Sequence, residues 1–313
     1  MIVLIGGSGF IGSNLAYKLK KKKINFKILD IKANPKLESY TTIVNILDKE
    51  NLIKYIPINS IIINLAAVHH DDEKTADYYL VNVEGSKNIC EVASLNKCKK
   101  IIFFSSVSVY GVAKSYADEN SPLNPNNHYG KSKKKAEMVY LAWNKKHQNN
   151  ALVILRPTAI FGPGNRGNIF NLINQIYKGP IFLVGSGKNT KSLAYLENIT
   201  DFVLYILSIK KKIMICNYVD KPQLTLKELI SFCKKEFNQD ENIKKIPYIV
   251  LFAFALTLDL LSFIFNKKFK INRARIKKFT AESSYQANLN GFVPIFSLKE
   301  GLKQTIKKEF NIF

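Results

Sequence analysis

The chain has 313 residues, 47% of them hydrophobic, which is enough for one large or two modest globular domains. Lysine and arginine number 47 against 24 aspartate and glutamate residues, so the net charge is +23 and favours partners such as nucleic acid, anionic lipid or phosphorylated substrates. No nucleic-acid-binding motif accompanies the lysine runs, so we predict no nucleic-acid partner.

The first twelve residues are typical of an apolar strand that turns into a helix. Gly6, Gly9 and Gly12 follow the strand with the spacing G-x-x-G-x-x-G. Gly6 permits a tight turn, Gly9 lets a pyrophosphate approach the backbone, and Gly12 lets the helix pack closely on the strand. The helix N-terminus and its dipole favour phosphate. Asp30 ends the next predicted strand, about 20 residues on, where a carboxylate binds a ribose hydroxyl. Together these features predict a dinucleotide site.

Strands and helices alternate through the first half of the chain. We predict strands at residues 1–5, 25–29, 42–45, 60–64, 100–105 and 151–155, and helices at 10–22, 48–55, 76–95 and 129–146. This alternation predicts an α/β fold with a doubly wound parallel sheet that binds ligands at the carboxyl ends of its strands.

The second half is less regular. We predict helices at residues 168–178, 197–208 and 225–237, and extended segments at 181–184, 190–195 and 214–219. The predicted domains are a Rossmann domain over residues 1–155 and a smaller, mainly substrate-binding C-terminal domain over residues 156–313, with 192–219 returning to the first.

Two short motifs carry the candidate chemistry. Tyr129 and Lys133 are four residues apart on a predicted helix, so both project from one face. Ser105 and Ser106 end a predicted central strand. An ammonium group and an oxidised nicotinamide favour the phenolate, so we expect a depressed pKa for Tyr129, which then takes a proton from a carbinol. Y-x-x-x-K alone also fits a surface tyrosine, but the glycine turn, Asp30 and the serine pair in the right order favour an active site.

Seven segments, in order, resemble the extended short-chain dehydrogenase/reductase family in its nucleotide-sugar epimerase and dehydratase branch. They are GGSGFIG (6–12), Asp30, NLAA (64–67), VNVEG (81–85), SSVSVYG (105–111), YGKSK (129–133) and RPTAIFGPGNRG (156–167). The resemblance implies tightly held NAD, with Ser106 and Tyr129 as catalytic groups and Lys133 as their electrostatic partner. The implied cofactor contacts are Gly6, Gly9, Phe10, Ile11, Gly12, Asp30, Ile31, Asn45, Ile46, Leu65, Ala66, Ala67, Asn82, Ser105, Tyr129, Lys133 and Pro157.

Further segments resemble the bacterial 4-epimerases that act on an N-acetylhexosamine linked to undecaprenyl diphosphate, in the assembly of O-antigen and other surface polysaccharides. These segments are residues 68–85, 164–173, 191–199, 217–222 and 247–279. The resemblance implies epimerisation at C4, in which Tyr129 takes the O4 proton and NAD takes the hydride, which returns to the opposite face. The implied substrate contacts are His69, Ser106, Ser108, Tyr129, Asn165, Arg166, Asn168, Lys191 and Arg275.

Some positions depart from the family pattern. Asn45 stands where the family usually has an aspartate that contacts adenine, and Lys191 stands where many UDP-sugar epimerases have a diphosphate-binding arginine. Lysine lacks the bidentate fork of arginine. We interpret His69 and His70 as structural, and we predict no metal site. The four cysteines have no C-x-x-C spacing, which fits a reducing cytoplasm.

Residues 247–265 are nearly all apolar, with Asp259 as the only charge, and a run rich in lysine and arginine follows at 267–278. Two interpretations stay open. One is a buried helix or helix pair of the second domain. The other is a helix in a membrane interface, with the basic run on anionic head groups, on a cytoplasmic protein that binds peripherally at the inner face of the cytoplasmic membrane.

Other functions remain as alternatives. One is a soluble UDP-sugar 4-epimerase. Another is an NAD(P)H-dependent 4-keto-sugar reductase, although Asp30 would repel the 2′-phosphate of NADPH. A dehydratase is disfavoured, because that branch usually has an acidic residue pair beside the serine and Val107 and Ser108 supply none. A non-catalytic NAD-binding scaffold is also disfavoured, because it would not need Ser106, Tyr129 and Lys133. The resemblance also implies a homodimer through the helices at 76–95 and 132–146.

Overall fold

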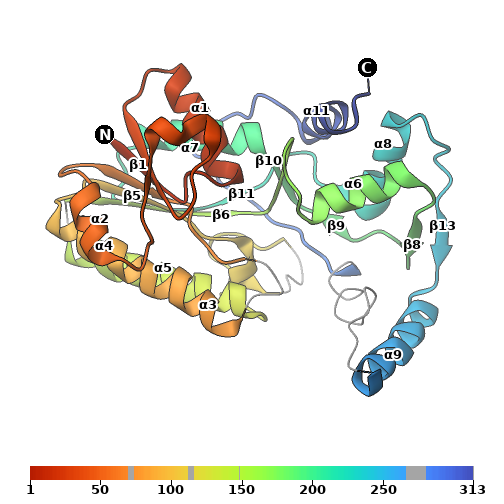
Figure 1. Cartoon of the computed structure of the whole chain (residues 1–313). Coiled ribbons are helices and arrows are strands. Elements are labelled where there is room, and N and C mark those ends of the chain that lie inside the picture. Colours follow the sequence, from red (N-terminus) through yellow and green to blue (C-terminus); the bar gives the residue numbers. More distant parts are fainter. Residues whose placement is uncertain (70–73, 112–115, 148, 266–279, 313) are drawn as a thin grey trace.

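The structure, a computed structural model, describes residues 1–69, 74–111, 116–147, 149–265 and 280–312. A seven-stranded sheet in the order β11-β6-β5-β4-β1-β2-β3, with all neighbours parallel, organises the larger part of the molecule (Figure 1). Its strands are β1 (Ile2–Ile5), β2 (Phe26–Asp30), β3 (Thr41–Ile43), β4 (Ile61–Asn64), β5 (Lys100–Phe104), β6 (Ala151–Pro157) and β11 (Ile213–Tyr218). The strand order reverses between β1 and β4, which is where open α/β sheets bind ligands. The predicted doubly wound parallel sheet is confirmed.

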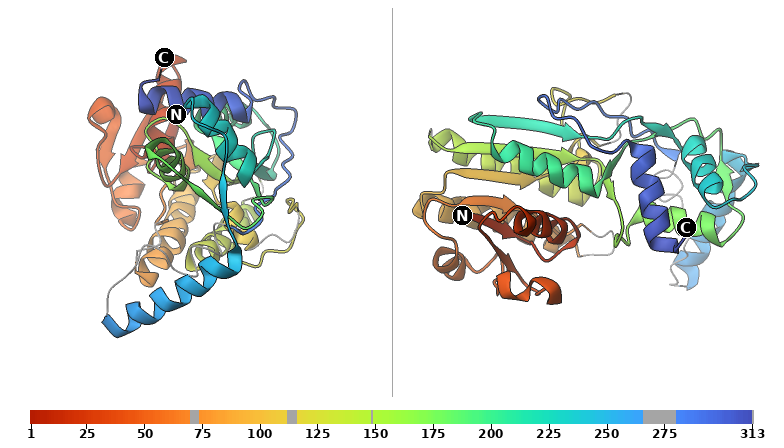
Figure 2. Two further views of the ribbon diagram at one scale, coloured as in Figure 1. Left: turned by 90° about the vertical axis from the view of Figure 1, so that its right-hand side faces the viewer. Right: turned by 90° about the horizontal axis from the view of Figure 1, so that it is seen from above.

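Helices cover both faces of this sheet, as the view from above shows (Figure 2). One face carries α1 (Phe10–Lys21) and α7 (Leu196–Leu207), and the other carries α2 (Lys49–Tyr55), α4 (Gly85–Leu95) and α5 (His128–Lys146). Side chains alternate along the strands, so Leu4 packs in the core with α1 whereas Val3 packs in the core with α4. Because both faces are buried, the strands are almost continuously apolar.

The predicted helix at 76–95 is not one regular helix. It divides into α3 (Thr75–Tyr79), a π-helical turn η2 (Leu80–Glu84) and α4. A π turn holds one residue more than an α turn, so it changes the direction in which the following side chains point. Here the wider turn contains Asn82, which is buried and bonded to a neighbouring loop.

A second, smaller core follows the carboxyl ends of β6 and β11. Its helices are α6 (Asn168–Lys178), α8 (Leu226–Glu236) and α11 (Leu298–Phe310). Three strand pairs join them, namely β7 (Ala159–Phe161) with β10 (Leu193–Tyr195), β9 (Thr190–Lys191) with β12 (Leu224–Thr225), and β8 (Phe182–Val184) with β13 (Lys244–Ile246). Between β10 and β12 the chain returns to the large sheet through α7 and β11. Lys18 of α1 holds α7 in place, with Nζ 2.7 Å from Asp201 Oδ1 and 3.1 Å from Glu197 Oε2.

Helix α9 (Tyr248–Phe265) projects away from the small core (Figures 1 and 2). Its base packs on Val184 through Tyr248 and Leu251, whereas Ile249 is 79% exposed and Val250 is 59% exposed. These exposures disagree with the interpretation of residues 247–265 as a buried helix, since none of the described elements covers Ile249 and Val250. Among the helices of the described residues, none combines the length and apolarity needed to cross a membrane.

Candidate functional site

The turn between β1 and α1 contacts the loop after β4 so closely that only glycine fits. Gly6 has a φ of +76°, and a Cβ there would lie 2.6 Å from the backbone nitrogen of Ala66. A Cβ on Gly12 would lie 2.5 Å from the Cα of Gly7. At Gly9 the nearest atom to a Cβ would be the Gly6 carbonyl oxygen at 3.4 Å, so the side of the turn at Gly9 is open.

The residues around this turn fit a dinucleotide. Asp30 Oδ2 accepts a hydrogen bond of 2.9 Å from the Ser8 backbone N–H, so the carboxylate lies at the edge of the turn. Helix α1 begins at Phe10 without a side-chain cap, which leaves its first N–H groups for an anion. In the part of the chain that the structure describes, the buried Ser8 Oγ has no hydrogen-bond partner. An open turn, free helix N–H groups, an unpaired hydroxyl and a nearby carboxylate are the groups that a pyrophosphate and a ribose use.

The ends of β2 and β3 border the same region. Ile31 and Asn45 are exposed, and Asn45 Oδ1 accepts a bond of 3.0 Å from the Leu47 N–H of its own loop. Ile46 is buried against Gly85 of α4, where a Cβ would approach Ile46 to 2.9 Å. The contact between Asn45 and adenine stays a prediction.

Asn82 fastens the loop after β4, which contains Leu65, Ala66 and Ala67, to the catalytic helix. Its Nδ2 donates to the Val68 carbonyl at 3.0 Å and to Ser132 Oγ at 2.9 Å, and its Oδ1 accepts from the Val68 N–H at 2.9 Å. The amide therefore holds this loop against α5. His69 follows in the loop and is exposed, and His70 lies outside the described residues.

Ser106, Tyr129 and Lys133 come together beyond the end of β5. Ser106 caps the 3-10 turn η3 (Val107–Tyr110), since its Oγ accepts the Ser108 N–H at 3.1 Å and lies 3.2 Å from Ser108 Oγ. The Ser106 side chain lies close enough to the Tyr129 hydroxyl to lower its pKa. Lys133 Nζ donates to the Phe104 carbonyl at 2.7 Å and lies 5.9 Å from the centre of the Tyr129 ring. The structure thus gathers the three predicted catalytic side chains.

Burial shifts the pKa values of the two ionisable groups in opposite directions. It raises the pKa of Tyr129 to about 12, and the nearby Ser106 side chain opposes this shift. It lowers the pKa of Lys133 to about 7, and the Glu137 carboxylate opposes that shift. The expected depression of the Tyr129 pKa includes the charge of an oxidised nicotinamide and stays a prediction, whereas the protein's own groups raise this pKa. The reason is that desolvation outweighs the surrounding charges, while the Lys133 ammonium is bonded to a carbonyl.

Two buried side chains of the site were missed from sequence. Arg156 Nε lies 2.9 Å from Glu137 Oε1, and Arg156 Nη2 lies 2.6 Å from Glu137 Oε2. Ser105 was predicted to contact the cofactor, but its buried hydroxyl donates to the Glu137 carboxylate. Glu137 follows Lys133 by four residues, so the face shared by Tyr129 and Lys133 extends to it and was a usable signal. Pro157, next to Arg156, is buried.

The predicted substrate contacts in the small core are tied to their own domain. Arg166 Nη1 lies 2.8 Å from Glu309 Oε2, and Asn165 Oδ1 accepts from the Gly167 N–H at 2.6 Å. Asn168 begins α6 and is exposed. Lys191 Nζ donates to the Ala281 carbonyl at 2.9 Å, and burial lowers its pKa to about 8. Arg275 lies outside the described residues.

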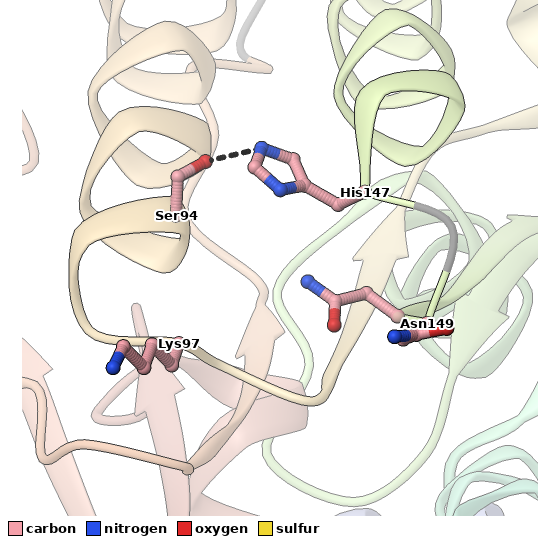
Figure 3. Close-up of a pocket in the computed structure, with 5 residues that line it drawn as sticks. Ser94, Lys97, His147 and Asn149 are labelled. Carbon is pink, nitrogen blue, oxygen red and sulfur yellow. Dashed lines mark hydrogen bonds between the residues drawn. The ribbon is translucent and has the colours of Figure 1, made fainter.

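A separate cavity of about 230 Å³ lies at the other end of the sheet, where α4 and α5 end (Figure 3). Ser94 Oγ there is 2.8 Å from His147 Nε2, but it also donates to the Cys90 carbonyl at 2.9 Å and accepts from Trp143 Nε1 at 3.1 Å. These bonds saturate the hydroxyl, so the pair is structural. The described residues contain no group of three or more His, Cys, Asp or Glu side chains that could hold a metal ion.

The profile of the NAD dependent epimerase/dehydratase family matches residues 2–215. The chain is 39% identical over 315 residues to the N-acetyl-alpha-D-glucosaminyl-diphospho-ditrans,octacis-undecaprenol 4-epimerase of Escherichia coli O157:H7, covering 99% of this chain and 95% of that protein. It is 29% identical to the UDP-glucose 4-epimerase of Vibrio cholerae over 65% of each chain. The solved UDP-glucose 4-epimerase of Thermotoga maritima has a TM-score of 0.78 at 20% identity, covering 99% of this chain and 98% of that one. The UDP-glucuronic acid 4-epimerase of Bacillus cereus, in complex with NAD, has a TM-score of 0.72 at 21% identity, covering 98% of this chain and 97% of that one. The two structural likenesses show a shared fold.

We predict that Gly9→Ala weakens NAD binding without unfolding the protein. The new methyl group meets only the Gly6 carbonyl oxygen at ordinary contact distance, so the turn tolerates it. It fills the space through which a pyrophosphate approaches, so we expect affinity to fall by about tenfold or more. Calorimetric titration with NAD and a thermal unfolding curve measure both effects. Unchanged affinity in a folded variant would place the pyrophosphate elsewhere.

We predict that Lys133→Met changes the pH dependence of stability. Burial lowers the folded-state pKa of Lys133 to about 7 from an ordinary 10.5, so between these values the unfolded chain binds a proton that the folded chain does not. Wild-type stability therefore gains from rising pH in this window, and the variant loses that gain. The free energy of unfolding of the variant, taken relative to that of wild type, should therefore be highest near pH 6 and fall as the pH rises to 10. Urea unfolding across this range tests it, with the exposed Lys131→Met as control. A constant difference would contradict a depressed pKa.

Proposed function

Because the chain belongs to the NAD dependent epimerase/dehydratase family, we propose that it inverts C4 of an N-acetylhexosamine held on a diphosphate carrier. The observation that carries the reaction is that Ser106 and the buried Lys133 both lie close to Tyr129, next to a turn that fits NAD. The carrier that we propose is undecaprenyl diphosphate, with N-acetylglucosamine converted to N-acetylgalactosamine for O-antigen or other surface polysaccharides. The E. coli relative supports this choice, since the similarity to it spans both cores.

The proposed chemistry assigns one task to each side chain. NAD, when bound, accepts the hydride from C4 and returns it. Tyr129 takes the O4 proton as the carbinol is oxidised and gives a proton back on reduction. Ser106 holds the Tyr129 hydroxyl in place, and the Lys133 ammonium favours the phenolate. The 4-keto sugar turns between the two steps, so no external reductant is consumed.

We also propose that α9 brings the protein to the membrane that holds this carrier. Ile249 and Val250 present exposed apolar side chains on a helix that projects from the small core. In the sequence, a run rich in lysine and arginine follows at 267–278. An apolar helix surface, followed in the sequence by basic residues, matches a bilayer with anionic head groups.

A homodimer through α4 and α5 is part of the proposal. The predicted interface helices expose Leu95 and Met138, each 62% accessible. Apolar side chains at that exposure support a partner surface, and the family resemblance supplies the geometry.

The test of function offers the purified protein two donors without added cofactor. They are UDP-N-acetylglucosamine and membranes loaded with undecaprenyl-diphospho-N-acetylglucosamine. We expect N-acetylgalactosamine from the lipid-linked donor, and we expect Tyr129→Phe to lower its rate by about 100-fold or more. Conversion of the UDP-sugar alone would mean a soluble UDP-sugar epimerase. Activity only on a 4-keto sugar with added NAD(P)H would mean a reductase.

The membrane proposal predicts that Ile249→Glu combined with Val250→Glu releases the protein from anionic vesicles. Two carboxylates on this face remove apolar contact and repel the head groups, while both positions are too exposed to disturb the fold. Cosedimentation with vesicles measures the bound fraction. Ile58→Glu is the matched control, because Ile58 is equally exposed on the large domain. Equal binding of all three proteins would mean that α9 does not contact the membrane.

A further inference from the structure

A buried ion pair lies beneath the catalytic side chains. Glu137 is 2% exposed on α5, one turn after Lys133, and Arg156 is 3% exposed on β6. The guanidinium binds both carboxylate oxygens, at 2.9 Å through Nε and 2.6 Å through Nη2. Ser105, the residue before Ser106, donates its hydroxyl to the same carboxylate. The pair therefore joins α5, β5 and β6 at the point where Ser106 leaves the sheet.

The same guanidinium also holds the far end of the turn that Ser106 caps. Arg156 Nη1 donates to the Tyr110 hydroxyl at 2.8 Å, and Tyr110 ends η3. The Tyr110 hydroxyl donates to Asn217 Oδ1 at 2.8 Å, and Asn217 Nδ2 donates to the Gln286 carbonyl at 2.8 Å. One cation thus connects the Ser106 turn to β11 and to the segment that leads into the small core.

We propose that Glu137 and Arg156 are positioning residues for C4 epimerisation, and that their ion pair holds Ser106 in register with Tyr129 and Lys133 on α5. This inference rests on the proposed function and assigns residues to it. A buried pair seldom adds much net stability over well-packed apolar side chains, so its geometry is the more informative property. Neither side chain needs to touch the sugar, since Ser105 lies between the carboxylate and Ser106.

The pair also sets the charge that Lys133 faces. On α5 the ionisable neighbours of Lys133 are Tyr129 and Glu137. Arg156 on β6 is bonded to Glu137, and Tyr110 on η3 is bonded in turn to Arg156. The Glu137 carboxylate favours the ammonium form of Lys133 against burial. If Glu137 becomes glutamine, Arg156 stays charged without its counter-ion, and both effects disfavour the ammonium. Removing both charges together takes away that excess positive charge.

The test uses Glu137→Gln, Arg156→Met and the double variant, with lysine labelled by isotope at Cε and its resonances followed by NMR against pH. The Lys133 signal is assigned by its loss in Lys133→Met. We expect Glu137→Gln to move the Lys133 titration to lower pH by about one unit, and the double variant to move it back toward wild type. In donor assays kcat should fall by about tenfold or more, with KM within about twofold, because no substrate contact is lost.

Two further variants distinguish a positioning role of the Glu137–Arg156 ion pair from a purely structural one. Glu197→Gln breaks an ion pair with Lys18 on the other face of the sheet, so it controls for a lost pair and should leave the Lys133 titration in place. Glu137→Asp keeps the charge on a shorter side chain, so it should retain the titration while kcat falls, and it serves if Glu137→Gln does not fold. A Lys133 titration that no variant moves would make the pair purely structural and overturn the inference. Because the titration needs no substrate, a wild-type protein that converts no donor would instead overturn the proposed function.

Discussion

The contact between the β1–α1 turn and the loop after β4 governs the arrangement of the whole site. Gly6 and Ala66 meet at a distance that admits no side chain, at the point where the strand order reverses. The loop after β4 is therefore fixed against the turn, and Asn82 fixes it in addition to α5 through Val68 and Ser132. Helix α5 carries Tyr129 and Lys133. A short series of contacts thus sets the distance between the dinucleotide turn and the catalytic side chains.

Burial is the main cause of the pKa shifts of both Tyr129 and Lys133. It disfavours the charged form of any group, so it raises the pKa of Tyr129 and lowers that of Lys133. Near neutral pH only the Lys133 shift lowers the charge of the site, because tyrosine is already uncharged there at its ordinary pKa. A nearby charge can oppose the effect of burial on a pKa. Glu137 does so for Lys133, because its carboxylate favours the ammonium form. A buried carboxylate on a lysine-rich helix thus lies one turn from Lys133, where it opposes the effect of burial on the Lys133 pKa.

Local patterns predicted the parts of the fold that local chemistry determines. Apolar strands, the glycine turn and the Y-x-x-x-K spacing each depend on residues close in the chain. The elements predicted in the first half lie within two residues of their predicted bounds, apart from the helix at 76–95, which divides into α3, η2 and α4. Helix α11 was missed because Gly301 interrupts its pattern, and only its packing on Tyr195, where a Cβ would lie 2.6 Å from the ring, explains that glycine. The Glu137–Arg156 pair was missed because its partners meet only when α5 and β6 are packed together. The desolvation that raises the pKa of Tyr129 in the protein alone was missed because it depends on a tertiary environment that spacing does not report.

The small core links the two proposals about carrier and membrane. The loop with Asn165 and Arg166 precedes α6, and Glu309 of α11 holds that loop through Arg166. In the same core, β8 supplies Val184, on which the base of α9 packs. The domain predicted to bind the sugar diphosphate is therefore the domain that carries the exposed apolar helix. A polyprenyl chain is attached at the diphosphate, so a lipid-linked substrate would enter with its tail toward this domain. A UDP carrier would need no such surface, and the exposed face of α9 is accordingly the structural feature that most favours the lipid carrier.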